Sequence, residues 1–208
     1  MLKTRVKQLS LAVLLLAVFA GLSAHPAAAS TQPATAAAPG QAYWTGDAPG
    51  TVANDPILLA PDASGAGCPS NITTGSGKWA CLNSQYDHWG YRGILRRGSW
   101  DSSTGVGWGW EKALNYHNLF QQPTLDTIEL SATRVDQANN TRYRYVAYHY
   151  NTQHQVDQEV VVVVTHVKTD KNSGTSPDSW AVGVYTAYCN NGSGSSEVRC
   201  PDWVNSTL

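Results

Sequence analysis

Five consecutive valines, residues 160–164, constrain the possible folds more than any other feature of this sequence. β-Branched side chains favour strands, and an apolar run without alternating polar residues is typical of a strand buried on both faces. Segment 158–167 is therefore predicted to be a central strand of a β-sheet.

Three further segments are predicted to be strands of the same sheet. Residues 126–135 alternate apolar and polar side chains, residues 141–150 are dense in aromatic and β-branched side chains, and residues 179–188 close the set. A helix is predicted over 110–120, because apolar residues and His117 recur from Trp110 at helical spacing and Pro123 follows.

The predicted fold class is α+β. One main helix packs on a four-stranded antiparallel β-meander, and a loop-rich, disulfide-stapled N-terminal region over 43–104 wraps or extends it. That N-terminal region is rich in Gly, Pro, Ser, Asn and Trp, and a clear period is scarce in it. It is therefore predicted to hold mostly loops and short pieces of structure.

The N-terminus has the pattern of a secretory signal peptide. Lys3, Arg5 and Lys7 precede an apolar run, and the small residues ending at Ala29 offer a cleavage site. We predict a signal peptide over 1–29, a flexible leader over 30–42, and a single secreted, extracellular domain over 43–208 that does not associate with membranes after cleavage.

The net charge argues against a broadly basic surface. Three of the 14 Lys and Arg residues and none of the 15 Asp and Glu residues lie in the signal peptide, which leaves a net charge of −4. Proteins that bind nucleic acid usually carry a basic surface, so any anion-binding site here is expected to be local.

Four cysteines allow three disulfide pairings in an exported protein. Pairing Cys68 with Cys81 and Cys189 with Cys200 is favoured, because each bond then closes a short loop rich in Gly, Ser and Asn. Zinc binding is disfavoured, because the cysteines show no C-x-x-C spacing and no histidine adjoins them. No metal and no cofactor is predicted.

Two predicted strands carry polar side chains that could bind an anion. Arg142 and Arg144 share one face of the strand 141–150, and two such arginines can hold a phosphate or a carboxylate. Thr186 and Tyr188 share a face of the last strand. The plainer interpretation is that the arginines lie along tyrosine rings at the surface and that Thr and Tyr reflect strand propensity alone.

The predicted helix carries His117 on its apolar face. Imidazole titrates near neutral pH and suits general acid–base catalysis, although a histidine in this position is more often structural. Lys112 lies five residues earlier, roughly 140° away around the helix, where it could reach the rim of a site.

The order of these segments resembles the ribonuclease-like toxin domains of the barnase, RelE and EndoU type. The helix "KALNYHNL" is followed by a Tyr/Arg strand, a valine-rich strand and a last strand ending "VGVYTAYC", and the resemblance covers residues 105–189, about half of the predicted mature chain. The signal peptide, the Trp/Gly loops and the tail "CPDWVN" also resemble secreted actinobacterial proteins.

This resemblance implies an enzyme that cleaves RNA without a metal. It makes His117 the acid or base, and it makes Arg144, with Arg142, the group that holds the scissile phosphate. Thr186 and Tyr188 would line the site on the last strand.

Two main hypotheses for function follow. The first is a toxin-like, metal-independent ribonuclease or related phosphodiester-cleaving enzyme, whose partners are RNA and a protein inhibitor. It requires His117, Arg144 and Thr186 or Tyr188 to converge on one solvent-open cleft, so that the edge of the helix borders the sheet face that carries Arg144. The second is a non-catalytic secreted module that recognises a protein or a cell-wall glycan through exposed aromatic patches. A third alternative is a secreted structural protein.

Overall fold

The computed structural model describes residues 41–50, 65–191, 196–197 and 199–208, all of which belong to the compact unit Pro33–Leu208. The predicted signal peptide and nearly all of the predicted leader lie outside the described residues. The strands are β1 (Tyr43–Thr45), β2 (Cys81–Tyr86), β3 (Arg92–Arg96), β4 (Ser99–Asp101), β5 (Val106–Trp108), β6 (Val135–Gln137), β7 (Arg142–Tyr150), β8 (Val156–Thr165), β9 (Thr169–Asp170), β10 (Gly174–Thr175), β11 (Gly183–Asn191) and β12 (Ser196–Glu197). The helices are α1 (Gly109–His117), α2 (Gln121–Leu130) and α3 (Val204–Thr207).

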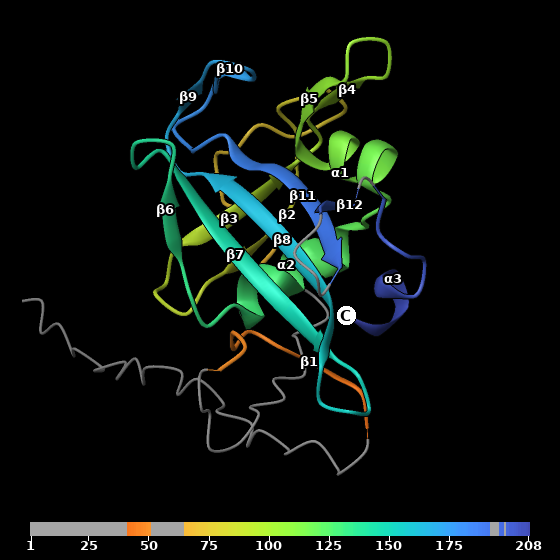
Figure 1. Cartoon of the computed structure of the whole chain (residues 1–208). Helices are drawn as coiled ribbons and strands as arrows, with labels where there is room; N and C mark the ends of the chain where they lie inside the picture. Colours follow the sequence, from red (N-terminus) through yellow and green to blue (C-terminus); the bar gives the residue numbers. More distant parts are fainter. Residues whose placement is uncertain (1–40, 51–64, 192–195, 198) are drawn as a thin grey trace, which may run out of the picture. The chain divides into compact units, whose positions relative to one another are not determined.

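The largest sheet runs in the order β1-β7-β8-β11-β12 and is antiparallel at every pairing (Figure 1). β6 joins the same edge of β7 as β1: β6 pairs with the N-terminal part of β7 and β1 with its C-terminal part. β8 carries the five valines and lies between β7 and β11, as predicted for the central strand.

The predicted fold class is wrong. Strands account for 37% of the structure and helices for only 14%, and the strands form several sheets rather than one meander. The N-terminal region, predicted to be mostly loops, contains two antiparallel hairpins, β2–β3 and β4–β5. Glycines within and between these short strands conceal the alternation by which strands are usually recognised in a sequence.

The strand predicted over 126–135 is also wrong, because residues 121–130 form α2. Side chains around nearly all of α2 are buried, so this helix lacks the polar face that makes a helical period visible. Asn118 ends α1 in a left-handed conformation with φ 56°. Pro123, predicted to stop the first helix, instead lies in the first turn of α2, where its missing N–H costs little.

The main hydrophobic core lies on one face of the largest sheet, which we call the inner face. Alternate residues of β7, β8 and β11 point into this core, where they pack against Leu125 and Ile128 of α2 and Leu95 of β3. Figure 1 shows α2 behind the sheet in that view. The opposite face, here called the outer face, holds a smaller cluster of Val146, Tyr148, Val161 and Val163. The valine strand is therefore buried on both of its faces, as predicted.

Both predicted disulfides are confirmed. Cys68 is bonded to Cys81, and Cys189 is bonded to Cys200. The second bond joins β11 to the C-terminal segment, and Cys200 also donates its backbone N–H to the carbonyl of His117 at 2.6 Å. The disulfide and this hydrogen bond together link β11, the C-terminal segment and the end of α1.

A close crossing of two backbones precedes α1. Trp108 ends β5 and is 1% exposed, and Gly109 follows it with φ +73°. A Cβ added at Gly109 would lie 2.7 Å from the Cα of Gly98 and 2.9 Å from the carbonyl oxygen of Arg96. Glycine is thus required at this position both by its backbone conformation and by the space available. The tryptophan–glycine stretch 105–110 anchors the start of α1.

Gly109→Ala is expected to lower the free energy of unfolding by about 1–3 kcal/mol more than Gly105→Ala does. Gly105 also has a positive φ, but a Cβ added there meets no atom within 4 Å. The difference between the two variants therefore isolates the crowding at Gly109 from the backbone conformation. Denaturant unfolding of the oxidised proteins measures both, and equal losses would contradict a tight crossing.

Candidate functional site

Cross-strand pairing arranges the outer face in rows. Arg144 on β7 lies opposite Val163 on β8, which lies opposite Thr186 on β11. Neighbouring strands are about 4.8 Å apart, so roughly 10 Å separates the backbones of Arg144 and Thr186. An arginine side chain and a bound anion together can fill that gap.

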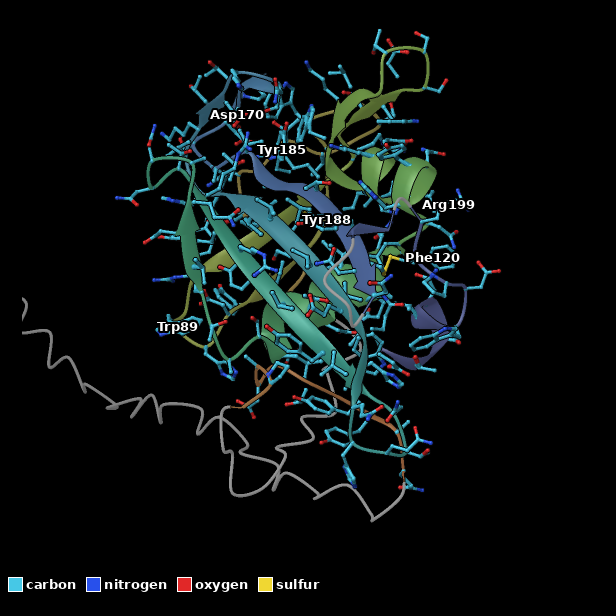
Figure 2. All side chains as sticks on the ribbon, viewed as in Figure 1. Trp89, Phe120, Asp170, Tyr185, Tyr188 and Arg199 are labelled. Atoms are coloured by element: carbon cyan, nitrogen blue, oxygen red, sulfur yellow. A yellow bond between two sulfur atoms is a disulfide. The ribbon has the colours of Figure 1, made fainter. Side chains whose placement is uncertain are left out.

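The two following rows also carry side chains that point to the outer face. Val146, Val161 and Tyr188 form an apolar row, of which Figure 2 labels Tyr188 on β11. The next row runs from Tyr148 through Glu159 to Asn190. The apolar row therefore lies between a row that begins with a guanidinium and a row that holds a carboxylate.

His117 reaches this face from α1, which packs beside β11. Its Nε2 lies 3.4 Å from Oγ1 of Thr186, and the centroid of its ring lies 5.8 Å from that of Tyr188. The side chain is 8% exposed, and its backbone carbonyl is held by the N–H of Cys200. The structure thus brings together His117, Thr186 and Tyr188, and it places them on the face that carries Arg144.

Arg144 is half-buried, and its guanidinium has no ion pair or hydrogen bond within the described residues. Burial raises the pKa of the neighbouring Tyr148 hydroxyl, the Glu159 carboxylate raises it further, and the Arg144 guanidinium lowers it. Both charges therefore lie near the same hydroxyl. A half-buried guanidinium without a fixed partner favours an anionic ligand.

Glu159 is a candidate that the sequence interpretation missed. It is half-buried, and Nδ2 of Asn190 donates to its Oε2 at 3.2 Å. A signal for it exists in the sequence: two-residue alternation from Val163 through Val161 reaches Glu159, so the carboxylate shares the face of those valines. The valine run predicts a buried strand, and that prediction alone assigns no role to the polar residue at its N-terminal end.

Arg142 and Lys112 lie apart from this group, near the start of β11. Arg142 forms an ion pair with Asp170 at 2.6 Å, and its Cζ lies 3.7 Å from the ring centroid of Tyr185. Nζ of Lys112 lies 5.4 Å from the same centroid. Figure 2 shows Tyr185 and Asp170 close together at one end of β11, with Tyr188 further along the strand. The two predicted binding residues therefore meet at Tyr185 and not at His117.

The largest exposed aromatic side chains lie outside this face. Trp89 is 50% exposed and Trp203 is 38% exposed. Each contacts other groups: the guanidinium of Arg134 lies 5.1 Å from the Trp89 ring, and His149 lies 4.8 Å from that of Trp203. The described residues thus show separate exposed tryptophans.

Two further features would point to other kinds of site. No group of three or more His, Cys, Asp or Glu side chains among them is placed to hold a metal ion. None of the helices formed by these residues is long and apolar enough to cross a membrane. No family model, no curated protein and no solved structure matches this chain.

Proposed function

We propose that this protein is a secreted, toxin-like ribonuclease that cleaves RNA at the outer face without a metal. The observation that carries the proposal is the convergence of His117 and Arg144 on one face, joined by the row through Thr186. The approach of His117 Nε2 to Thr186 at 3.4 Å and the unpaired guanidinium of Arg144 within the described residues support it. The two disulfides are compatible with an extracellular location.

Cleavage of RNA by its own 2′-hydroxyl requires three groups. A base takes the proton of the 2′-hydroxyl, whose oxygen then attacks the phosphorus. An acid protonates the departing 5′-oxygen, and a cation stabilises the charge that builds on the phosphate oxygens. The products are a 2′,3′-cyclic phosphate and a 5′-hydroxyl.

The residues of the outer face can supply these groups. In our proposal the Glu159 carboxylate takes the proton, the imidazolium of His117 returns one to the leaving oxygen, and Arg144 binds the phosphate. The phosphate lies beside the Arg144 guanidinium, because the valines of the apolar row between Arg144 and Glu159 are buried. Thr186 orients the imidazole, and the Tyr188 ring lies beside it.

His117→Ala is expected to lower the rate of RNA cleavage by about 10²–10⁴-fold, because the leaving oxygen loses its proton donor. The measurement uses the oxidised protein and end-labelled RNA in EDTA, with the cyclic phosphate identified among the products. The exposed His154, replaced by asparagine, is the matched control and is expected to leave the rate unchanged.

His117 is buried, so its replacement could also weaken the fold. Arg144→Gln tests the same site without that difficulty, because Arg144 is half-buried and has no partner to lose within the described residues. Loss of cleavage in both variants, with native unfolding transitions, supports the proposal. If the folded wild-type protein yields no cyclic phosphate, the ribonuclease proposal is overturned in favour of a binding protein that uses exposed aromatics such as Trp89.

A further inference from the structure

We infer that the outer face has a second anion subsite, formed by Lys112, Arg142 and Tyr185, that binds the phosphate next to the scissile one on a single RNA strand. This inference rests on the proposed function. It assigns to the enzyme a substrate of at least two consecutive phosphates.

Two cations share one tyrosine ring at this subsite. The ring centroid of Tyr185 lies 3.7 Å from Cζ of Arg142 and 5.4 Å from Nζ of Lys112. Nδ2 of Asn172 donates a hydrogen bond to the Tyr185 hydroxyl, which holds the ring in place. The aromatic face stabilises each cation, but it removes no net charge.

The positive charge of the subsite is only partly compensated. Asp170 is the one carboxylate paired with these cations in the described part of the chain, and it engages Nη2 of Arg142. Nε of Arg142 is buried without a hydrogen-bond partner there, and Lys112 has no ion pair with any described residue. Burial and the nearby Arg142 both lower the pKa of Lys112, which shows that the two cations repel each other. An anion between them would relieve that repulsion.

The position of the subsite fits a neighbouring phosphate. Arg142 and Arg144 share the outer face of β7 and are two residues apart, a distance of about 7 Å along the strand. On α1, Lys112 precedes His117 by five residues, or about 7.5 Å of helix rise. On both elements, the subsite residue therefore lies in the same direction from the row of Arg144, Val163 and Thr186. The separation is about the length of one nucleotide.

A deoxythymidine oligonucleotide tests this subsite without cleavage, because it lacks the attacking 2′-hydroxyl. Lys112→Met is expected to weaken its binding about tenfold and to make the slope of log K against log salt shallower by about 0.7. Asp170→Asn is expected to strengthen binding, because it removes the competing carboxylate. The exposed Lys78, which lies 5.6 Å from the Trp79 ring centroid, provides the matched control as Lys78→Met, with no change expected.

Fluorescence anisotropy of the labelled oligonucleotide measures all four proteins across a salt series. Unchanged binding in Lys112→Met, or weaker binding in Asp170→Asn, would overturn the inference. RNA substrates separate it from the proposed function: Lys112→Met should lower kcat/KM on a trinucleotide with two phosphates and leave a dinucleotide with one phosphate unaffected. Cleavage of both RNAs without any effect of Lys112→Met refutes the subsite alone. Lys112-dependent binding by a protein that cleaves nothing refutes the ribonuclease alone.

Discussion

Asp178→Asn is expected to lower the free energy of unfolding by about 3–5 kcal/mol, because it leaves a buried guanidinium without its counter-charge. Arg96 is 0% exposed, and both of its Nη atoms donate to Asp178, at 2.8 and 3.0 Å. The same carboxylate accepts the backbone N–H of Thr73 at 2.9 Å and the hydroxyl of Ser176 at 2.8 Å. Denaturant unfolding at neutral pH measures the loss.

The matched control for Asp178→Asn is Glu111→Gln. Glu111 lies 3.6 Å from Arg97 in a pair of which both side chains are about a third exposed. Surface pairs of this kind contribute less than about 1 kcal/mol, so the control should change stability little. Equal losses in the two variants would contradict the structural role assigned to Asp178.

The effect of Asp178→Asn also has a defined pH dependence. Burial alone would raise the pKa of Asp178, but hydrogen bonds from Arg96, Thr73 and Ser176 outweigh burial and hold the pKa below its usual value. A lowered folded-state pKa adds stability that is complete above the unfolded pKa of about 3.9 and is lost as the pH falls through the folded value. The difference between wild type and variant should therefore shrink only below about pH 4.

Glu159→Gln is expected to lower the rate of RNA cleavage by about 10²–10⁴-fold with little change in stability. Glutamine keeps the size of the side chain, and its carbonyl oxygen can still accept the hydrogen bond from Asn190. It cannot take a proton from the 2′-hydroxyl. The cyclic-phosphate assay described above measures the rate, and the unfolding transition shows whether the fold is retained.

Asp157→Asn is the matched control for Glu159→Gln, because it removes a carboxylate from the same strand. Asp157 pairs with His149, which belongs to the inner-face set of β7, so cleavage should not change. If cleavage survives in Glu159→Gln, another residue must be the base. The outer face would then retain only the roles of His117 and Arg144.

The sequence pattern predicted correctly the elements whose burial leaves a clear periodicity in the sequence. The valine run of β8 is buried on both faces and has no polar residue to confuse its pattern, so its place at the centre of the sheet followed from the sequence. α2 was missed because tertiary contacts surround it, and a helix buried on nearly all sides resembles a strand over a short window. The hairpins β2–β3 and β4–β5 were missed because glycines within and between these short strands conceal the alternation of a strand.

The candidate site could be predicted residue by residue but not as an arrangement. Alternation places Arg144 with Arg142 on one face of β7, and Thr186 with Tyr188 on one face of β11. It cannot say that α1 brings His117 to the outer face, because that depends on the Gly109 crossing at the start of the helix and on Cys200 at its end. Alternation also could not show that Arg142 pairs with Asp170 and Tyr185 while Arg144 does not.

The bond between Cys189 and Cys200 makes the geometry around His117 depend on redox state. Reduction would remove the covalent bond between β11 and the C-terminal segment, whose Cys200 N–H binds the carbonyl at the end of α1. In a reducing cytoplasm this bond does not persist, whereas in an oxidising exterior it does. The segment that holds the end of α1, and with it His117 beside Thr186, therefore has covalent support only in oxidising surroundings.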